Sequence, residues 1–211
     1  MHADGLAGMG HAVENLFWQD LKANRAMKKY LMKGQTLEEE EPIGTFSIGT
    51  CDYREEMEND GLNELFRANA PRVAVRMVKN ASLIDFAGPN RKVYQVTVSN
   101  RHNMSILGLT KLFLSSGHCV MLNNKIVKAR DAGQLVKIYF YWVVPPGKAT
   151  AWIDKAPKTI VPGKSQDEES DSTTPLAGKG LLKECLANYV IQRILVMDTA
   201  PTVVSTDVPT V

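Results

Sequence analysis

The chain has 211 residues, of which 44% are hydrophobic and 23% are charged, and its formal net charge is +2 at pH 7. A chain of this length supports one substantial core with decorated ends rather than two large domains. The nearly neutral charge excludes a positive field over the whole molecule, so any contact with nucleic acid must be local. The candidate basic segments are residues 25–29, 72–79 and 125–130.

Three cysteines, Cys51, Cys119 and Cys185, are widely spaced and form neither a CxxC motif nor a zinc-like pattern with histidine. This pattern favours free thiols in a reducing intracellular compartment. No apolar run approaches the roughly 20 residues that cross a bilayer, and the first residues lack the charged start and apolar core of a signal peptide. We therefore expect an intracellular protein without a membrane partner.

The first segment combines a helical pattern with an acidic run. Apolar residues three or four positions apart over residues 13–31 predict an amphipathic helix that ends at Gly34. Residues 38–41 are all glutamate and precede Pro42, which favours an exposed loop over regular structure.

Residues 45–78 are predicted to form a short strand, a helix and a second strand. Residues 45–48 predict a short strand, and residues 52–69 predict a helix weakened at Gly61, where glycine costs about 1 kcal/mol relative to alanine. The apolar side chains of this helix that we expect in the core are Leu62, Leu65 and Phe66. Alternation over residues 72–78 predicts the first of three consecutive strands.

A hairpin then carries the most distinctive polar residues of the chain. Asp85 lies among apolar neighbours on the predicted second strand, and the turn residues 88–90 follow it. Residues 93–98 alternate as a third strand, on which Gln95 and Thr97 share one face. The hairpin thus presents an aspartate beside a Gln-x-Thr pair.

After the hairpin, apolar residues over 106–113 repeat with helical spacing up to Gly117. Residues 118–122 are typical of a strand or an extended link. The run 136–144 is continuous in β-branched and aromatic residues, which predicts a central strand buried on both faces.

The C-terminal part changes composition sharply. Residues 162–180 are rich in Gly, Pro, Ser, Thr and acidic residues, which predicts a flexible linker. Residues 181–196 predict an apolar helix that docks on the core or on a protein partner, and residues 199–211 predict a disordered tail. The units we expect are 1–43, 44–161, 162–180, 181–198 and 199–211.

The order helix, three strands, helix, strand, with an acid on the second strand and a polar pair on the third, resembles the PD-(D/E)xK nuclease superfamily. Within it, IDFAGP, VYQVTVSNRHNM and YFYWVVP resemble the C-terminal region of trypanosomatid retrotransposon hot spot proteins and the related Crinkler effectors. The resemblance covers about residues 62–146. It implies an α/β (α+β) protein with a restriction-endonuclease-like αβββαβ core and a mixed sheet, flanked by N-terminal and C-terminal helices. It also implies a nuclear protein associated with DNA or RNA.

The resemblance assigns roles to individual residues. In active members, an aspartate and a second carboxylate hold Mg²⁺ or Mn²⁺, and a lysine steadies the attacking water and the phosphate. Asp85 matches the aspartate, whereas Gln95 replaces the second carboxylate and Thr97 replaces the lysine. Glu64 is a substitute metal ligand, and His102 is a further catalytic candidate. These replacements imply a pseudo-nuclease with weak or lost catalysis.

Structural alternatives exist for the same residues. Asp85 in an apolar strand is as compatible with a hydrogen bond to Asn90 or to a backbone amide as with metal binding. Gln95 and Thr97 fit a polar outer face or a cross-strand hydrogen-bonded pair, and His102 fits a helix cap or a surface position.

Two further alternatives concern partners. The basic residues that could contact phosphate, or simply face solvent, are Lys125, Lys128 and Arg130. The alternative function is a non-enzymatic protein-interaction module that assembles a larger complex through the core and the C-terminal helix.

Overall fold

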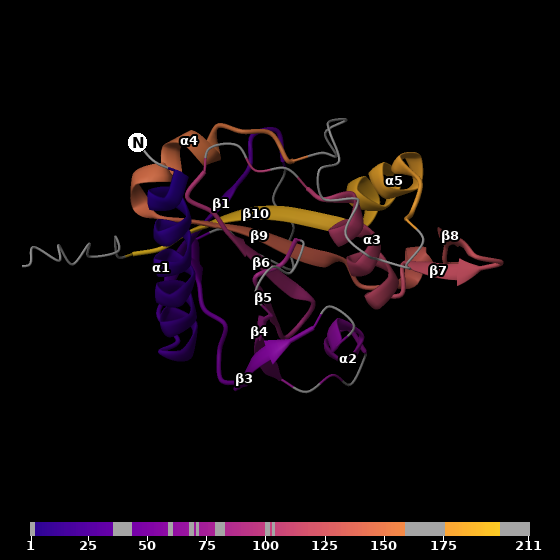
Figure 1. Cartoon of the computed structure of the whole chain (residues 1–211), viewed down its shortest axis with the longest axis horizontal. Coiled ribbons are helices and arrows are strands. Elements are labelled where there is room, and N and C mark those ends of the chain that lie inside the picture. Colours follow the sequence, from indigo (N-terminus) through magenta and orange to yellow (C-terminus); the bar gives the residue numbers. More distant parts are fainter. Residues whose placement is uncertain are drawn as a thin grey trace, which may run out of the picture.

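The computed structural model describes residues 3–35, 44–58, 61–67, 70, 72–78, 83–99, 102, 104–158 and 176–198. Its centre is an eight-stranded sheet with the strand order β2-β1-β10-β9-β6-β5-β4-β3 (Figure 1). The strands of this sheet are β1 (Met27–Leu31), β2 (Gly44–Phe46), β3 (Asp52–Met57), β4 (Val73–Met77), β5 (Phe86–Gly88), β6 (Lys92–Val96), β9 (Ile138–Val144) and β10 (Val190–Val196).

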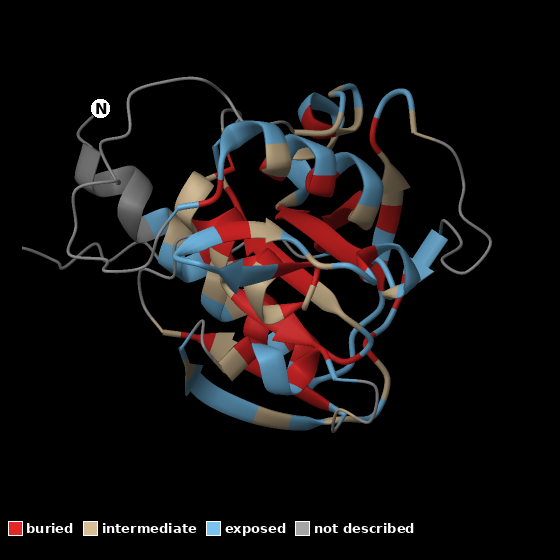
Figure 2. Ribbon diagram, turned by 90° about the vertical axis from the view of Figure 1, so that its right-hand side faces the viewer, coloured by how far each residue is buried: buried red, intermediate tan, exposed pale blue. Residues whose placement is uncertain are grey.

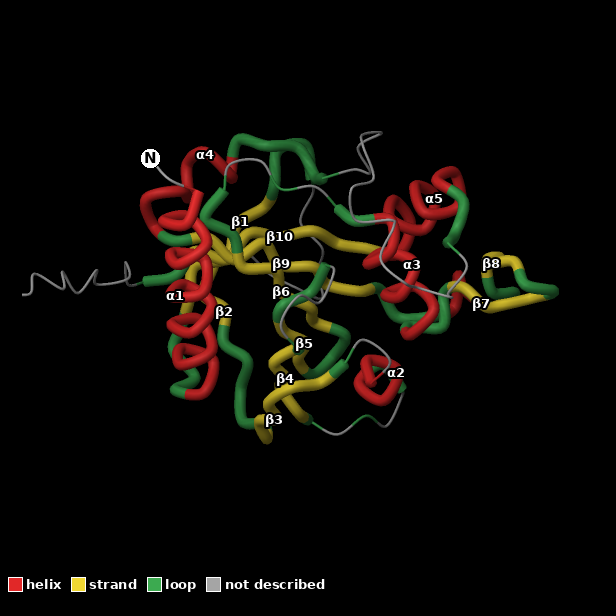
Figure 3. Tube along the Cα trace, viewed as in Figure 1, coloured by secondary structure: helices red, strands yellow, loops and turns green. Residues whose placement is uncertain are grey.

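The helices and a small hairpin complete the described structure. The hairpin of β7 (Cys119–Leu122) and β8 (Lys125–Lys128) projects from the body of the molecule (Figure 3). The α-helices are α1 (Ala3–Lys22), α2 (Leu62–Leu65), α3 (Ile106–Ser115), α4 (Ala149–Ile153) and α5 (Lys179–Tyr189). Two short 3₁₀ turns, Ala132–Gln134 and Pro146–Lys148, flank β9 along the chain. None of the described helices is long and apolar enough to span a membrane.

The sheet is mixed, as predicted. Strands β4, β5 and β6 form an antiparallel meander, while β9 is parallel to both β6 and β10. Parallel pairs need crossover connections. The chain between β6 and β9 contains α3, and the chain between β9 and β10 contains α4 and α5. The coarse prediction of an α+β protein with a mixed sheet is therefore confirmed.

The predicted central strand is also confirmed. All seven residues of β9 are buried, and β9 lies between two parallel neighbours, β6 and β10. Figure 2 shows buried residues gathered in the middle of the molecule. Because side chains alternate along a strand, Phe140 and Trp142 join one apolar cluster while Tyr139 and Tyr141 join the other.

Each face of the sheet has its own helical cover. On one face, Val13, Phe17 and Leu21 of α1 pack with Phe86 and Tyr94. On the opposite face, the cluster is built with buried residues from α2, α3, α4 and α5. In Figure 1, α1 lies on the left of the sheet and α3 and α5 on the right.

The predicted helix over residues 13–31 is wrong in its second half. The helix α1 ends at Lys22, Asn24 adopts φ +48° in the following turn, and β1 then pairs with β10. The apolar residues of β1 are too few to distinguish a helical from a strand period, so pairing with a distant strand decided its conformation.

The predicted helix over residues 52–69 is wrong in its first half. Residues 52–57 form β3, which pairs in parallel with β4 at the edge of the sheet, and α2 has only four residues. Charged residues dominate β3 and suit an exposed edge, where they discourage pairing with other chains. The predicted core residues of this segment are buried as expected: Leu62, Leu65 and Phe66.

The predicted helix over residues 181–196 is also wrong in its second half. The helix α5 ends at Tyr189, and the β-branched run that follows becomes β10, which lies between β1 and β9 and is buried throughout. A short, continuously apolar run cannot be assigned to a buried helix or a buried strand from its pattern alone.

Other predicted elements are confirmed: the strand over 45–48 as β2, the strand over 72–78 as β4, the hairpin as β5 and β6, the helix over 106–113 as α3, and the extended segment over 118–122 as β7. The acidic run 38–41, residues 162–175 of the predicted linker and the tail 199–211 lie outside the described residues. The last two residues of the predicted linker belong to α5. All three cysteines are free thiols, and the Sγ atoms of Cys119 and Cys185 lie 3.8 Å apart.

Candidate functional site at Asp85

Asp85 occupies the last position before β5, where its backbone joins both neighbouring strands. Its amide donates to the Tyr94 carbonyl of β6 at 2.9 Å, and its carbonyl accepts from the Met77 amide of β4 at 2.9 Å. The ends of three strands therefore determine where the Asp85 side chain lies.

The Asp85 carboxylate is held by β6. Its Oδ2 atom accepts a hydrogen bond from Gln95 Nε2 at 2.8 Å and another from the Val96 amide at 2.7 Å. The structure thus brings Asp85 and Gln95 together as a cross-strand hydrogen-bonded pair. It also contains the hydrogen bond from a backbone amide to Asp85 that the sequence allowed as an alternative to metal binding. These described partners belong to β6 rather than to the turn at Asn90.

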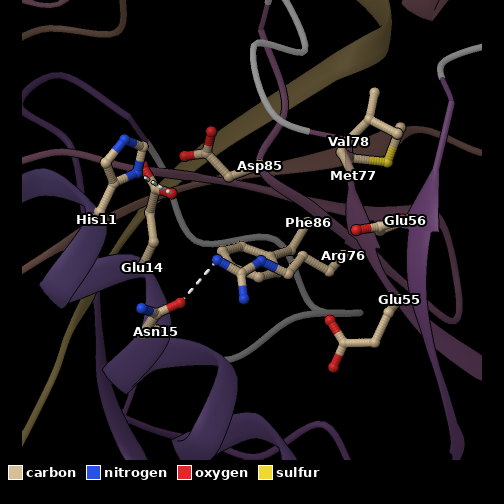
Figure 4. A pocket seen from close by; sticks show the side chains of 10 residues that line it. All are labelled: His11, Glu14, Asn15, Glu55, Glu56, Arg76, Met77, Val78, Asp85 and Phe86. Atoms are coloured by element: carbon tan, nitrogen blue, oxygen red, sulfur yellow. Dashed lines mark hydrogen bonds and ion pairs between the residues drawn. The ribbon is translucent and has the colours of Figure 1, made fainter.

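Asp85 faces a pocket of about 480 Å³ between the sheet and α1 (Figure 4). The pocket combines carboxylates with a guanidinium and an imidazole. Its lining residues are His11, Glu14 and Asn15 from α1, Glu55 and Glu56 from β3, and Arg76, Met77, Val78, Asp85 and Phe86 from β4, β5 and their flanks.

Burial dominates the ionisation of Asp85. The net effect of its surroundings raises the pKa of this carboxyl from 3.8 to about 7, with burial as the largest cause and the negative charge of Glu14 as the second. The hydrogen bonds from Val96 and Gln95 and the charge of Arg76 act in the opposite direction. The pKa of Asp85 therefore lies far above the usual range of an aspartate.

The other charged residues of the pocket have their own partners. Arg76 donates from Nη2 to Asn15 Oδ1 at 2.7 Å and lies over the Phe86 ring. Glu14 contacts the His11 ring at 3.3 Å. Hydrogen bonds from Lys22 and Trp18 lower the pKa of Glu55. Despite these contacts, Glu14 and Arg76 are the two charged residues that shift the pKa of Asp85.

Thr97 and His102 do not line this pocket. Thr97 is buried, and its Oγ1 accepts from the Ser99 amide at 3.1 Å. The His102 ring lies 5.6 Å from the Trp142 ring, centroid to centroid. Trp142 belongs to the apolar cluster on the face opposite α1.

The remaining candidates also lie away from Asp85. Glu64 is exposed on α2 and lies 4.0 Å from Arg54 of β3. Lys128 pairs with Glu184 of α5 across the base of the projecting hairpin, and Lys125 and Arg130 are exposed nearby. None of these four expected residues lines the Asp85 pocket.

Sequence reasoning missed the contribution of α1. His11, Glu14, Asn15 and Trp18 recur three or four positions apart, which places them along one stripe of the helix. This spacing alone could have predicted a polar face on the first helix. Only the packing of α1 against β4 and β5 shows that this face meets Asp85.

In the Asp85 pocket, the carboxylates that could contact a metal ion together are those of Asp85 and Glu14. Among the described residues, no group of three or more His, Cys, Asp or Glu is arranged to hold a metal. Asp85 and Glu14 repel each other, and a divalent cation between them would relieve that repulsion. Gln95 directs an N–H towards Asp85, so its amide orients the carboxylate rather than replacing the second acid. Asp85 and Glu14 are therefore the two pocket residues that could contact a divalent cation.

Comparison with protein-family models, with curated proteins and with solved structures finds no match to this chain.

Proposed function

We propose that this chain is a nucleic-acid-associated protein of the retrotransposon hot spot type, with a nuclease-like core whose metal site at Asp85 has weak or lost catalysis. The proposal includes action in the nucleus, as the resemblance implies. Its central observation is the Asp85 carboxylate, which faces Glu14 and Arg76 across a pocket and is oriented by Gln95 and the Val96 amide.

The arrangement of strands supports the nuclease-like part of the proposal. The meander β4-β5-β6 is followed by α3 and by β9 parallel to β6, and α1 and α3 contribute to clusters on opposite faces of the sheet. This succession supports the αβββαβ order that the resemblance implies. The four-residue α2 directly precedes β4, whereas α1 lies earlier in the chain, before β1, β2 and β3. The position of Asp85 beside the end of β6 also agrees with the resemblance.

The chemistry of the pocket supports weak or lost catalysis. Thr97 cannot provide the positive charge of the expected lysine, and it lies outside the pocket. Arg76 supplies a permanent positive charge that suits a phosphate, but a guanidinium does not accept a proton at neutral pH. The pocket can therefore hold a cation and attract phosphate, but it lacks the lysine of an active site.

Metal binding can be tested by thermal unfolding with and without Mn²⁺. We expect Mn²⁺ to raise the Tm of the wild-type protein, and Asp85→Asn and Glu14→Gln to reduce this rise. Glu64→Gln is the matched control, since Glu64 is a carboxylate outside the pocket, and it should respond to Mn²⁺ as the wild type does. Equal stabilisation of all four proteins, or of none, would overturn the metal site.

Nucleic-acid binding and cleavage need a separate experiment. We expect gel shifts with DNA or RNA that weaken as salt rises, because phosphate contacts release counterions. With Mn²⁺, cleavage should be slow or absent, and any cleavage should disappear in Asp85→Asn. Robust cleavage would contradict the loss of catalysis. Absence of any shift would overturn nucleic-acid binding and leave the protein-interaction module as the remaining function.

A further inference from the structure

A second pocket lies at the opposite end of the β5–β6 hairpin from Asp85. It has a volume of about 580 Å³, and its lining comes from the hairpin turn, the end of α2 with the segment that follows it, and the start of β9 with the residues before it. We call it the arginine pocket, defined by its four cationic residues: Arg67, Arg72, Arg91 and Lys92.

The described lining of the arginine pocket contains these four cationic side chains. No carboxylate is among its described lining residues. The residues between Arg67 and Arg72 that lie outside the described part are Ala68, Asn69 and Pro71, so the sequence adds no acid there. An anion in the hollow would relieve the repulsion among the three guanidinium groups, whereas the Lys92 ammonium lies over the Phe46 ring.

Arg91 is the best positioned of the four cations. Its Nη2 donates to the Phe66 carbonyl at 2.7 Å, and its Nη1 donates to the Val136 carbonyl at 3.1 Å. Two carbonyls from separate segments therefore hold the guanidinium in place. Neither carbonyl carries a full negative charge, and burial lowers the pKa of Arg91.

The backbone at this turn is held in an uncommon conformation. Asn90 and Arg91 have φ values of +60° and +56°, in the left-handed region that residues other than glycine seldom adopt. The Arg91 carbonyl accepts from the Tyr139 amide at 3.0 Å, which ties the turn to β9. The fold thus fixes the direction of the Arg91 side chain before any ligand binds.

The remaining lining suggests a ligand with both a phosphate and a less polar body. Leu65, Leu135 and Tyr139 supply apolar and aromatic surface beside the cations. Guanidinium groups bind phosphate through paired N–H donors, and the pocket volume lies within the range typical of small-molecule sites. A nucleotide combines these two features.

We infer that the arginine pocket binds a phosphate group carried by a nucleotide, with Arg91 as the fixed contact and Arg67 and Arg72 as adjustable ones. The phosphate belongs either to a free nucleotide or to a nucleic-acid strand. If it belongs to a strand, the inference rests on the proposed function and extends its binding surface. It requires no contribution from Asp85.

Isothermal titration at low salt tests the inference with four probes: pyrophosphate, ADP, adenosine and a single-stranded oligonucleotide. We expect ADP or the oligonucleotide to bind, and adenosine, which lacks phosphate, to bind at least about tenfold more weakly. Binding of ADP and pyrophosphate would assign the site to free nucleotides. Binding of the oligonucleotide without ADP would assign it to strands.

Substitution of the pocket arginines tests whether the probes bind in the arginine pocket. Arg67→Gln and Arg72→Gln should each weaken this binding about tenfold, since both side chains are exposed and each loss removes one charged contact. Arg72→Gln also removes the hydrogen bond from Arg72 Nε to the Thr50 carbonyl at 3.2 Å, so Arg67→Gln is the cleaner of the two variants. Arg54→Gln removes an exposed arginine of β3 that does not line the pocket; it is the matched control and should bind as the wild type does. Arg91→Gln is omitted because it would also free two carbonyls.

The outcomes separate this inference from the proposed function. Asp85→Asn should keep wild-type affinity for the probes, so loss of the Mn²⁺ effect leaves the arginine pocket intact. Absence of binding by both ADP and the oligonucleotide, or binding unchanged in Arg67→Gln and Arg72→Gln, would overturn the inference.

Discussion

Asp85 should give the protein an unusual dependence of stability on pH. Its pKa is about 7 in the folded state and near 3.8 when unfolded, so the folded state binds the additional proton between these values. Stability therefore falls as pH rises from about 4 to about 7 and is level above that. Urea unfolding at pH 5 and pH 8 should show a loss of up to about 2 kcal/mol that Asp85→Asn removes. A slope that survives in the variant would assign the effect to other groups.

The neighbours of Asp85 should move its pKa in opposite directions. Glu14 raises the pKa of Asp85 and Arg76 lowers it. We therefore expect Glu14→Gln to lower that pKa and Arg76→Gln to raise it, as measured by titration of the Asp85 carboxyl carbon by NMR. Shifts of the same sign in both variants would mean that rearrangement of the pocket, and not charge, controls the titration.

His118 should make the protein less stable as the pH falls below about 6.5. It is fully buried, its ring Nδ1 lies 2.8 Å from Ser116 Oγ, and burial followed by the charge of Arg91 lowers its pKa to about 4. Because the unfolded pKa is about 6.5, this contribution is complete above pH 6.5 and is lost as pH falls towards 4. His118→Gln should flatten the fall in Tm between pH 6.5 and pH 4.5. An unchanged fall would show that His118 stays neutral in that interval.

The C-terminal segment shows how an element depends on its partners. The sequence treats residues 181–196 as one docking helix, but β10 is an internal strand between β1 and β9. A chain ending at Gly178 should therefore lose its cooperative thermal transition, since two strands would lose their shared neighbour. A chain ending at Asp198 is the control, because it retains every described element. A folded 1–178 chain would mean that the sheet is stable without β10.

Elements whose pattern is local were predictable. The alternation over residues 93–98, the helical spacing over 106–113 and the continuous run over 136–144 each identified a real element. The errors over 27–31, 52–57 and 190–196 share one cause, since each segment became a strand through pairing with a strand distant in sequence. Intrinsic preference is a weak guide in such segments because tertiary contacts override it.

The candidate site was predictable in part for the same reason. Asp85 and Gln95 are ten residues apart on one hairpin, so their proximity follows from a local turn. Glu14 reaches Asp85 only because α1 covers that face of the sheet, and Arg67 and Arg91 share a pocket only because α2 lies beside the hairpin turn.

For the molecule as a whole, the sequence by itself determined an α+β chain with a mixed sheet, a central buried strand at β9 and a hairpin that carries Asp85 and Gln95. These features were predictable because the hydrophobic period and the turn residues that encode them lie within a few positions of one another. Tertiary structure decided that β1, β3 and β10 are strands, that α1 completes the Asp85 pocket and that four cations surround the arginine pocket. These features depend on contacts between distant segments, whose register and packing no local pattern encodes.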